Sequence, residues 1–317
     1  METVGPFFIS GFMTELMCYV GQQAVYEEAS DNMKKLTGTE VSGKQIERVC
    51  HYYGQKIEDA EQSMSVKEKK AQYEKDKLYY AMMDGGMMLT REEGWKEMKL
   101  CRIFAHTSIE QVSKNRKQVS ESTYIGHLGS HHKFWAKVEE HTNYIKQKVI
   151  IADGARWIWK WAEEKCPKAV QILDFYHAKE YLCRFAEEQF GDIEEKRRWI
   201  DQQSLRLLNN QIAGVIKDLE VMKPSGGAAC KAKMTLITYY QANSKRMQYK
   251  TYRDRGWLIG SGPIEAAHRH VIQQRMKLSG QRWTIDGAQQ LANLRMASKS
   301  NQWHKVYDAI HHQRAAA

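Results

Sequence analysis

Hydrophobic positions recur at three and four residues from Glu15 to about Lys75, which is the spacing of amphipathic helices, and strand-like alternation is missing there. We therefore expect a helical N-terminal region over residues 1–75. Ser42 follows a glycine-containing turn and predicts the N-cap of a helix over 43–55. This helix and the one before it have the outline of a helix-turn-helix. Three helices that pack together without touching DNA would show the same pattern.

Short apolar runs replace the helical spacing after Lys77. LYYAMMDGG, KEMKLCRIFAH and STYIGHL predict a three-stranded meander, and GSHHKFWAKVEEHTN predicts a helix after it. KVIIADGA predicts a fourth strand, a helix rich in tryptophan follows, and AVQILDFYHA predicts a fifth strand that ends at Asp174. Strands that are apolar throughout and separated by helices indicate an α/β fold with a mixed sheet flanked by helices.

The C-terminal half is expected to be mainly helical. No strand pattern occurs between Lys179 and about Tyr252, so residues 179–252 are predicted to be an all-α insertion, interrupted by a loop at KPSGGAA. The α/β domain would then consist of two parts, residues 76–178 and 253–300. The second part places glycines before a helix with Pro263 in its first turn and ends in the helix IDGAQQLANLRMASK. Residues 301–317 are predicted to be a tail.

Composition restricts the class of protein and its partners. The chain has 48 Lys and Arg against 38 Asp and Glu, a formal net charge of +10, so a polyanion is the first partner to consider. No long apolar run and no basic leader segment is present, so no membrane partner or signal peptide is expected. The six cysteines are widely spaced, which is typical of reduced thiols in a cytoplasmic protein.

Two of the predicted strands end in Asp-Gly, at Asp84 and Asp153. Strand ends form the ligand crevice of open α/β sheets, so the two carboxylates could lie side by side, although Asp-Gly is also ordinary turn chemistry. Glu265 is a third acid, in the first turn of a predicted helix, where the helix dipole alone would favour it. Three converging carboxylates would suit two Mg²⁺ ions about 3.5–4 Å apart, the arrangement that cleaves phosphodiesters. No Cys/His cluster suits zinc.

Basic residues surround the third acid. His268 and Arg269 follow Glu265 by three and four positions and would share its helix face. Between Arg253 and Lys299, eight Lys and Arg stand against three acids, a net charge of +5. This stretch could be a solvated face, but its overlap with Glu265 favours binding of a nucleic-acid backbone. The candidate DNA contacts are His268, Arg269, Arg275, Lys277 and Arg282. Trp283 is expected in the core, and Asp174 with His177 is interpreted as a satisfied polar pair at the edge of the site.

Three long segments resemble the DDE transposases of bacterial insertion sequences, specifically the ISKra group, which is distantly related to the Mutator-like transposases. They are LYYAMMDGGMMLTREEGWKEMKLCRIF, VIIADGARWIWKWAEEKCPKAVQILDFYHAKEYL and RGWLIGSGPIEAAHRHVIQQRMKLSGQRWTIDGAQQLANLR. The resemblance implies an RNase H-like catalytic domain with a helical insertion between the second and third acids. It matches Asp84, Asp153 and Glu265 to the catalytic, metal-binding acids. It also matches Asp174 and His177 to a supporting D-x-x-H element.

The function implied is metal-dependent DNA cleavage and strand transfer at the ends of an insertion sequence. Mg²⁺ is the expected cofactor, two ions per site, and Mn²⁺ is expected to replace it. Double-stranded DNA, as element ends and as target, is the expected partner, and action on two ends implies a homo-oligomer in the cytoplasm at the nucleoid. Two alternatives stay open. One is a non-catalytic DNA-binding protein, truncated or domesticated, because the family often carries more N-terminal sequence and shows Gly-Leu-Pro-Ile-Gly-Ser-Gly where this chain has GWLIGSG. The other is a structure-specific nuclease of the same fold.

Overall fold

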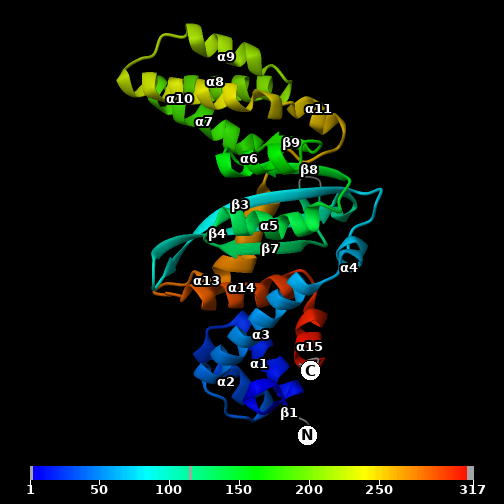
Figure 1. The fold of residues 1–317 in the computed structure, drawn as a ribbon. Helices are drawn as coiled ribbons and strands as arrows, with labels where there is room; N and C mark the ends of the chain where they lie inside the picture. Colours follow the sequence, from blue (N-terminus) through cyan, green and yellow to red (C-terminus); the bar gives the residue numbers. More distant parts are fainter. Residues whose placement is uncertain (1–2, 114–115, 313–317) are drawn as a thin grey trace. The chain divides into compact units, whose positions relative to one another are not determined.

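The computed structural model describes residues 3–113 and 116–312 (Figure 1). Within this part the chain folds into two compact units that alternate along the sequence. Unit 1 comprises Met1–Tyr79, Met83–Gln147 and Pro263–Ala317, and unit 2 comprises Tyr80–Met82 and Lys148–Gly262. Unit 2 therefore contains all of the predicted helical insertion, together with the strands and the helix that precede it.

Five strands form one sheet with the hydrogen-bonded order β7-β4-β3-β8-β9. They are β3 (Leu78–Thr90), β4 (Gly94–Ala105), β7 (Thr123–Leu128), β8 (Gln147–Ala152) and β9 (Val170–Leu173). Strands β4 and β7 are antiparallel, whereas β8 and β9 are parallel, with Ala152 opposite Leu173. The side chains from Val149 to Ala152 are fully buried, as a strand covered on both faces requires. The α/β class and the mixed sheet flanked by helices are confirmed.

Strand β3 is longer than the sequence predicts, and Asp84 lies inside it. The pattern predicts an end at Asp84, whereas β3 continues to Thr90 before the turn to β4. Gly85 and Gly86 stay in the strand because they make room for close neighbours. A Cβ on Gly85 would lie 2.1 Å from Glu97 Oε1, and one on Gly86 would lie 3.2 Å from His268 Nδ1. The interpretation of Asp84-Gly85 as the end of a strand is therefore wrong.

In the helical part of unit 1, helices from the N-terminal and the C-terminal part of the chain pack against each other. Its helices are α1 (Gly11–Gln23), α2 (Tyr26–Thr37), α3 (Gly43–Ser63), α4 (Val66–Ala71), α5 (His131–Thr142), α12 (Gly262–Ala267), α13 (Gln274–Met276), α14 (Ile285–Lys299) and α15 (Trp303–His311). Met17, Ile46 and Val49 from the N-terminal helices share one core with Leu294 and Val306 from the C-terminal helices. Figure 1 shows the blue helix α3 beside α14 and α15. Most of α14 is buried, so it serves as the central helix of this cluster.

The predicted N-cap of α3 is confirmed. The Ser42 hydroxyl accepts a hydrogen bond from the Gln45 backbone N–H at 3.2 Å. Helix α3 contacts α1, α2, α14 and α15, and its buried residues extend from Gly43 to Ile57. Packing against these helices explains why apolar residues recur at helical spacing in α3. Contact of α3 with DNA stays a prediction.

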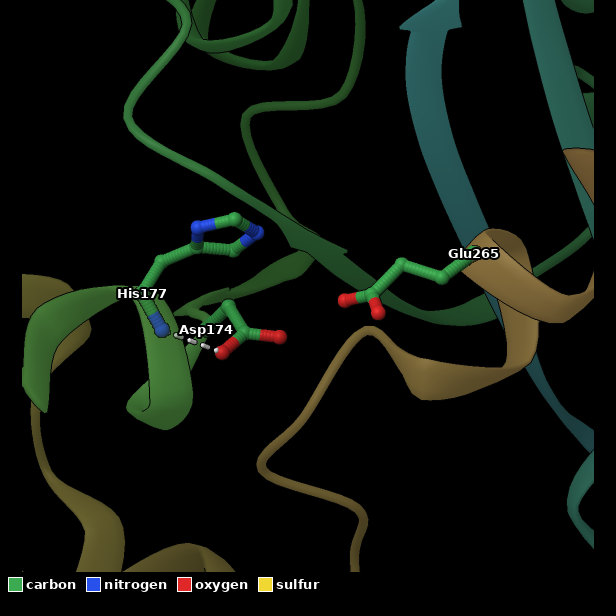
Figure 2. Close-up of side chains that lie close together, drawn as sticks. All are labelled: Asp174, His177 and Glu265. Atoms are coloured by element: carbon green, nitrogen blue, oxygen red, sulfur yellow. Dashed lines mark hydrogen bonds between the residues drawn. The ribbon is translucent and has the colours of Figure 1, made fainter. Parts of the chain in front are cut away.

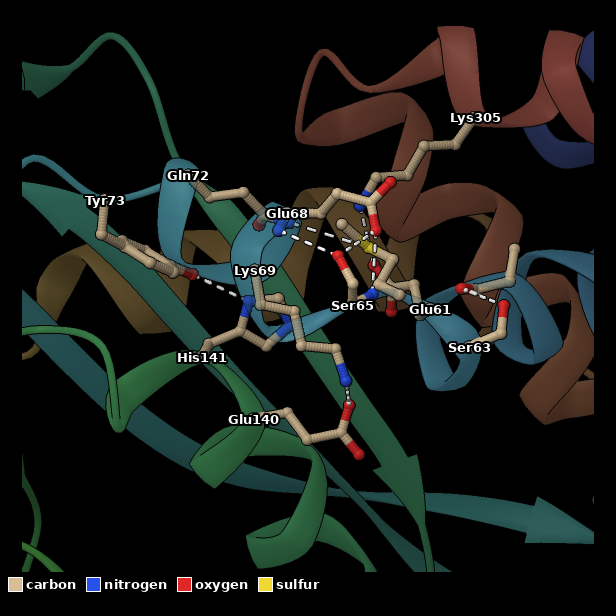
Figure 3. Close-up of polar contacts among 12 residues, drawn as sticks. Glu61, Ser63, Ser65, Glu68, Lys69, Gln72, Tyr73, Glu140, His141 and Lys305 are labelled. Atoms are coloured by element: carbon tan, nitrogen blue, oxygen red, sulfur yellow. Dashed lines mark hydrogen bonds and ion pairs between the residues drawn. The ribbon is translucent and has the colours of Figure 1, made fainter.

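Polar contacts fasten the segment between α3 and β3 to the rest of unit 1 (Figure 3). Ser65 and Glu68 form a reciprocal capping box at the start of α4. The Lys69 ammonium lies 2.9 Å from the Glu140 carboxylate, and the Tyr73 hydroxyl lies 2.8 Å from His141 Nδ1. These contacts tie α4 and the residues after it to α5 and so fix the entry of the chain into β3.

Unit 2 surrounds β8 and β9 with helices. They are α6 (Arg156–Lys165), α7 (Phe175–Gln189), α8 (Ile193–Leu208), α9 (Ile212–Val221), α10 (Gly227–Asn243) and α11 (Tyr249–Asp254). Fully buried side chains such as Trp161, Leu182, Phe185 and Tyr240 form its interior. The chain breaks between α8 and α9, where Asn210 adopts a positive φ of 62°. The predicted loop at KPSGGAA is confirmed between α9 and the start of α10.

Several local features escape the sequence pattern. Residues Ile109–Ser113 and Arg116–Val119 form a short hairpin, β5 and β6, and Thr3–Val4 pairs with Ile9–Ser10 as β1 and β2. Part of the predicted tail forms α15, and residues 313–317 lie outside the described part of the chain. None of the described helices is long and apolar enough to cross a membrane. All six cysteines lie in the described ranges and none forms a disulfide, in agreement with the predicted thiols.

Candidate active site

Asp84 is held by its backbone inside β3. Its Oδ1 accepts a hydrogen bond from the Gly85 N–H at 2.7 Å, and its side chain is 34% exposed. His268 Nε2 lies 3.1 Å from the Asp84 carbonyl oxygen and 3.9 Å from Oδ2. Because a carbonyl oxygen can only accept, Nε2 of His268 carries the proton and donates it. The buried imidazole therefore fixes the backbone of the strand at the acid and leaves the carboxylate facing an accessible region.

Glu265 lies on α12, exposed, three residues before His268. The start of this helix is anchored by Arg102 of β4, whose Nη1 donates to the Pro263 carbonyl oxygen at 2.8 Å. Arg102 is itself buried, and its Nε donates to the Ser122 hydroxyl at 2.8 Å. The segment that carries Glu265 is thus attached to β4 at one end and, through His268, to Asp84 at the other.

A π-helical turn, η4 (His268–Gln273), follows α12 directly. Such turns leave carbonyl groups without their usual helical donors and are frequent at functional sites. Here Arg295 of α14 supplies donors: its Nη2 lies 2.6 Å from the His270 carbonyl oxygen, and its Nε bonds to that of Val271. Arg295 also donates to the backbone of Gln22 in α1. Burial lowers the pKa of Arg295 to about 10, so it stays charged at neutral pH and holds η4 against α1.

Asp153 follows β8 in unit 2, as the sequence predicts. Its Oδ1 accepts a hydrogen bond from the Ala155 N–H at 2.9 Å, which starts the turn into α6. The next residue has to be glycine, because a Cβ on Gly154 would lie 2.3 Å from Cε2 of Tyr239. Tyr239 stacks on Tyr181, with ring centroids 3.9 Å apart, and so closes one side of this turn.

The Tyr239 hydroxyl is buried and has no hydrogen-bond partner among the described residues. Burial, and then the charges of Tyr181, Asp153 and Asp174, raise the pKa of this phenol well above its ordinary value. It therefore stays protonated and keeps an O–H donor near Asp153. No local pattern in the sequence points to this residue, because Tyr239 reaches the turn from α10, 86 residues after Asp153 in the chain.

Asp174 caps α7 and is fully buried. Its Oδ1 accepts a hydrogen bond from the His177 backbone N–H at 2.9 Å (Figure 2), and its Oδ2 accepts one from the Ser261 N–H. Its own N–H donates to the Ala152 carbonyl oxygen at 2.9 Å, which links it to the end of β8. The His177 side chain is 35% exposed and lies 3.5 Å from Glu180. The Asp174 carboxylate is thus satisfied by two backbone N–H groups, whereas the supporting role of Asp174 and His177 stays a prediction.

The basic residues predicted to bind DNA divide into two sets. Arg269, Lys277 and Arg282 are exposed and can meet a polyanion at the surface. His268 and Arg275 are buried, with 3% and 1% of their surfaces exposed. Arg295, which contributes to the positive charge of this stretch, is also buried. The basic surface is therefore smaller than the charge count indicates, because several of its cations hold the fold together.

The structure brings Asp84 and the Glu265 segment together in unit 1 through His268, and it brings the strand ends at Asp153 and Asp174 together in unit 2 through β8 and β9. Convergence of the two sets stays a prediction. Asp84, Asp153 and Glu265 all keep accessible carboxylates, and hard oxygen donors of this kind suit Mg²⁺ better than softer metals. The donor set therefore fits the expected cofactor.

A cavity of about 680 Å³ lies beside Asp153 in unit 2. It is lined by Gly154, by the stacked rings of Tyr181 and Tyr239, and by the basic side chains of Arg156, Lys160 and Arg246. The Arg246 guanidinium lies 4.5 Å from the Trp159 ring centroid and pairs with Glu163. Aromatic rings and cations thus line a cavity that borders the turn after the second predicted acid.

Comparison with known proteins gives a distant relative. The chain is 23% identical over 294 residues to a curated protein of Streptococcus gallolyticus named "UPF0236 protein in vanSb 3'region", and the match covers 89% of this chain. It covers 62% of that relative, so the chain spans less than two thirds of its length. No protein-family model matches the chain.

Proposed function

We propose that this protein is a metal-dependent DDE transposase that cleaves DNA at the ends of an insertion sequence and joins the freed 3′ hydroxyls to target DNA. The observation that carries the proposal is the hydrogen bond between His268 and Asp84, because it attaches the segment bearing the third predicted acid to the strand bearing the first. The strand order also supports it. Numbered along the chain, the strands run 3-2-1-4-5, which agrees with the RNase H-like sheet that the resemblance implies.

In this proposal Asp84, Asp153 and Glu265 would hold two Mg²⁺ ions, which when bound supply a reactive water or hydroxyl and stabilise the leaving oxygen. The protein's own residues position these ligands. His268 holds the backbone at Asp84, and Arg102 holds the start of α12 before Glu265. Asp174 caps α7 and stays bonded to the end of β8, so it supports Asp153 and is assigned no direct role as a ligand.

DNA would be held mainly by electrostatic contacts. Arg269 is exposed four residues after Glu265, and Arg156 and Lys160 are exposed on α6, three and seven residues after Asp153. Cations close to each acid would contact phosphates on either side of the cleaved bond. Binding should therefore weaken steeply as salt increases.

The test is cleavage of a labelled duplex that carries the DNA flanking the gene, with Mg²⁺, with Mn²⁺ and with EDTA. We expect cutting at the element boundary with either metal and none with EDTA. Asp84→Asn, Asp153→Ala and Glu265→Gln should each abolish cutting while DNA binding persists. Asp201→Asn, which changes an exposed acid on α8, is the matched control and should cut like the wild type.

Each alternative predicts a different result. DNA that is bound but never cut would favour a non-catalytic DNA-binding protein. Cutting of branched DNA regardless of terminal sequence would favour a structure-specific nuclease. Cleavage that survives Asp84→Asn would contradict the assignment of the acids.

A further inference from the structure

A second cavity, of about 280 Å³, lies in unit 1, where the N-terminal helices meet the segment that follows η4. Its lining includes Tyr26 from α2, His51 from α3, Arg91 from the turn after β3, and Arg275, Arg282 and Trp283. The cavity is therefore built from four parts of the chain that come together only on folding. None of the predicted metal-binding acids lines it.

Arg275 is the unusual group of this cavity. It is 1% exposed, and its guanidinium lies 4.8 Å from the Tyr26 ring centroid and 5.4 Å from that of Trp283. Its Nε donates to the Gly21 carbonyl oxygen at 3.2 Å, while Nη2 has no hydrogen-bond partner among the described residues. No carboxylate of the described chain forms an ion pair with it. A buried guanidinium remains charged and is costly to bury without an anion.

Two more guanidinium groups line the same cavity from exposed positions. The Arg91 Nε donates to the Arg282 carbonyl oxygen at 3.2 Å, and the Arg91 N–H donates to the Trp283 carbonyl oxygen at 2.8 Å. The Trp283 N–H returns a bond to the Leu89 carbonyl oxygen at 3.2 Å. These backbone bonds fix residues 282–283 against the turn between β3 and β4. The Arg91 side chain and the backbone of Arg282 are thereby held in place before any ligand arrives.

The other polar groups of the cavity leave its positive charge largely uncompensated. Glu47 lines it, but its carboxylate is bonded to the Lys44 ammonium at 2.5 Å. His51 Nε2 lies 3.5 Å from the Tyr26 hydroxyl, and burial lowers the pKa of this imidazole, so it is neutral at pH 7. Three arginines therefore face one carboxylate that is already paired.

We propose that this cavity binds one phosphodiester group of DNA, with Arg275 as the buried anchor and Arg91 and Arg282 as flanking contacts. Guanidinium groups suit phosphate oxygens because they offer several donors in a fixed geometry. The volume is below that of pockets that enclose a drug-sized ligand, so a phosphate whose chain continues outside fits better than a whole nucleotide. The inference rests on the proposed function only in taking DNA as the substrate. It adds a contact point that none of the three acids lines, formed jointly by α2, α3, the turn after β3 and the segment after η4.

The test measures binding of a fluorescent duplex in EDTA over a range of salt concentrations. The double variant Arg91→Gln/Arg282→Gln should lower the slope of log K against log salt by about 0.9, the value for one phosphate, and each single variant by no more than that. Arg197→Gln/Arg198→Gln, which changes two exposed arginines on α8, is the control of equal charge and should leave the slope unchanged. An unchanged slope in the double variant would overturn the inference.

A second measurement isolates Arg275, whose substitution could also weaken folding. Inorganic phosphate should raise the melting temperature of the wild type more than chloride at equal ionic strength, and Arg275→Met should remove this difference. Loss of the difference in Arg282→Gln, which changes an exposed side chain, would support the site without reference to the buried arginine. Stabilisation by phosphate without any DNA binding would overturn the assignment to DNA.

The outcomes separate this inference from the proposed function. A changed salt slope with no cleavage under any metal would retain the phosphate site and remove the transposase. Cleavage that depends on the three acids, with an unchanged salt slope in the double variant, would retain the transposase and remove the phosphate site.

Discussion

His268 Nε2 donates a hydrogen bond to the carbonyl oxygen of Asp84, at 3.1 Å, across a separation of 184 residues. The imidazole contacts the strand at the position where Gly86 has no side chain, since a Cβ there would lie 3.2 Å from His268 Nδ1. Asp84, Gly86 and His268 therefore form one packed arrangement. The residue types that look like a turn signal in the sequence serve in the structure to let a helix approach a strand.

Substitution of His268 should reduce activity without abolishing DNA binding. His268→Phe keeps the ring volume but removes the donor to Asp84, so we expect Mg²⁺-dependent cleavage to fall by about 10- to 100-fold, as for residues that orient a metal ligand. His268→Gln, which keeps a donor, should recover part of the loss. A merely structural role would leave the dependence on Mg²⁺ concentration unchanged, so a titration of the rate with Mg²⁺ is the deciding measurement.

Metal binding should stabilise the fold. Mg²⁺ at one hundred times its dissociation constant should raise the free energy of unfolding by about 2.7 kcal/mol, because it binds the folded acids only. Asp84→Asn should abolish most of this gain and Asp201→Asn should retain it. Chemical denaturation with and without Mg²⁺ measures the difference, and an equal gain in Asp84→Asn would show that the ion binds elsewhere.

Gly154→Ala should destabilise the turn after Asp153. The new Cβ would meet the Tyr239 ring at 2.3 Å, so we expect a loss of about 1–3 kcal/mol in the free energy of unfolding. Tyr239→Ala in the same chain should restore part of the stability by removing the clash. Gly191→Ala, where a Cβ meets nothing within 4 Å, is the control. Equal melting temperatures for Gly154→Ala and the control would refute the packing argument.

Arg295→Met should be strongly destabilising. Methionine keeps the apolar stem of the side chain but loses the bonds to the carbonyl oxygens of Gln22, His270 and Val271, and these acceptors stay buried. We expect a loss of about 3 kcal/mol in the free energy of unfolding. Lys299→Met, on the exposed side of the same helix, should change stability by less than about 0.5 kcal/mol. Denaturation by urea compares the two variants.

Acidification should weaken the fold in part through His127 of β7. Burial, and then the nearby ammonium of Lys137, lowers the pKa of His127 to about 4 from its ordinary 6.5. Its Nδ1 is buried and has no partner among the described residues. The unfolded chain therefore binds the proton more readily, so this contribution to stability is complete above about pH 6.5 and is lost as the pH falls toward 4.

His127→Gln should flatten the pH dependence of stability between pH 6.5 and 4. The exposed His304→Gln on α15 serves as the matched control and should keep the wild-type slope. Midpoints of urea denaturation measured across this range compare the three proteins. Parallel curves of stability against pH for the wild type and His127→Gln would exclude the burial of this imidazole as a cause of the loss of stability in acid.

Interactions between residues close together in sequence explain which parts of the fold could be predicted. The apolar run before Asp153 and the serine at position 42 act on their immediate neighbours, so the end of β8 and the cap of α3 follow from the residues beside them. The meander of β3, β4 and β7 follows for the same reason, since short apolar segments joined by turns pair with their sequence neighbours. Pattern and resemblance single out the three candidate acids, and their chemistry stays a prediction.

Contacts between residues that are distant in sequence explain the features that could not be predicted. Nothing near Arg275 or Arg295 in the chain shows that these cations are buried, because their contacts come from α1 and from η4. The continuation of β3 past Asp84 depends in the same way on His268 and Glu97, and the constraint on Gly154 depends on Tyr239. Periodicity and capping thus establish which elements form, since they depend on interactions within a few residues. Which charges are exposed, which glycines are needed for space and where an anion could bind depend on side chains that only folding brings together.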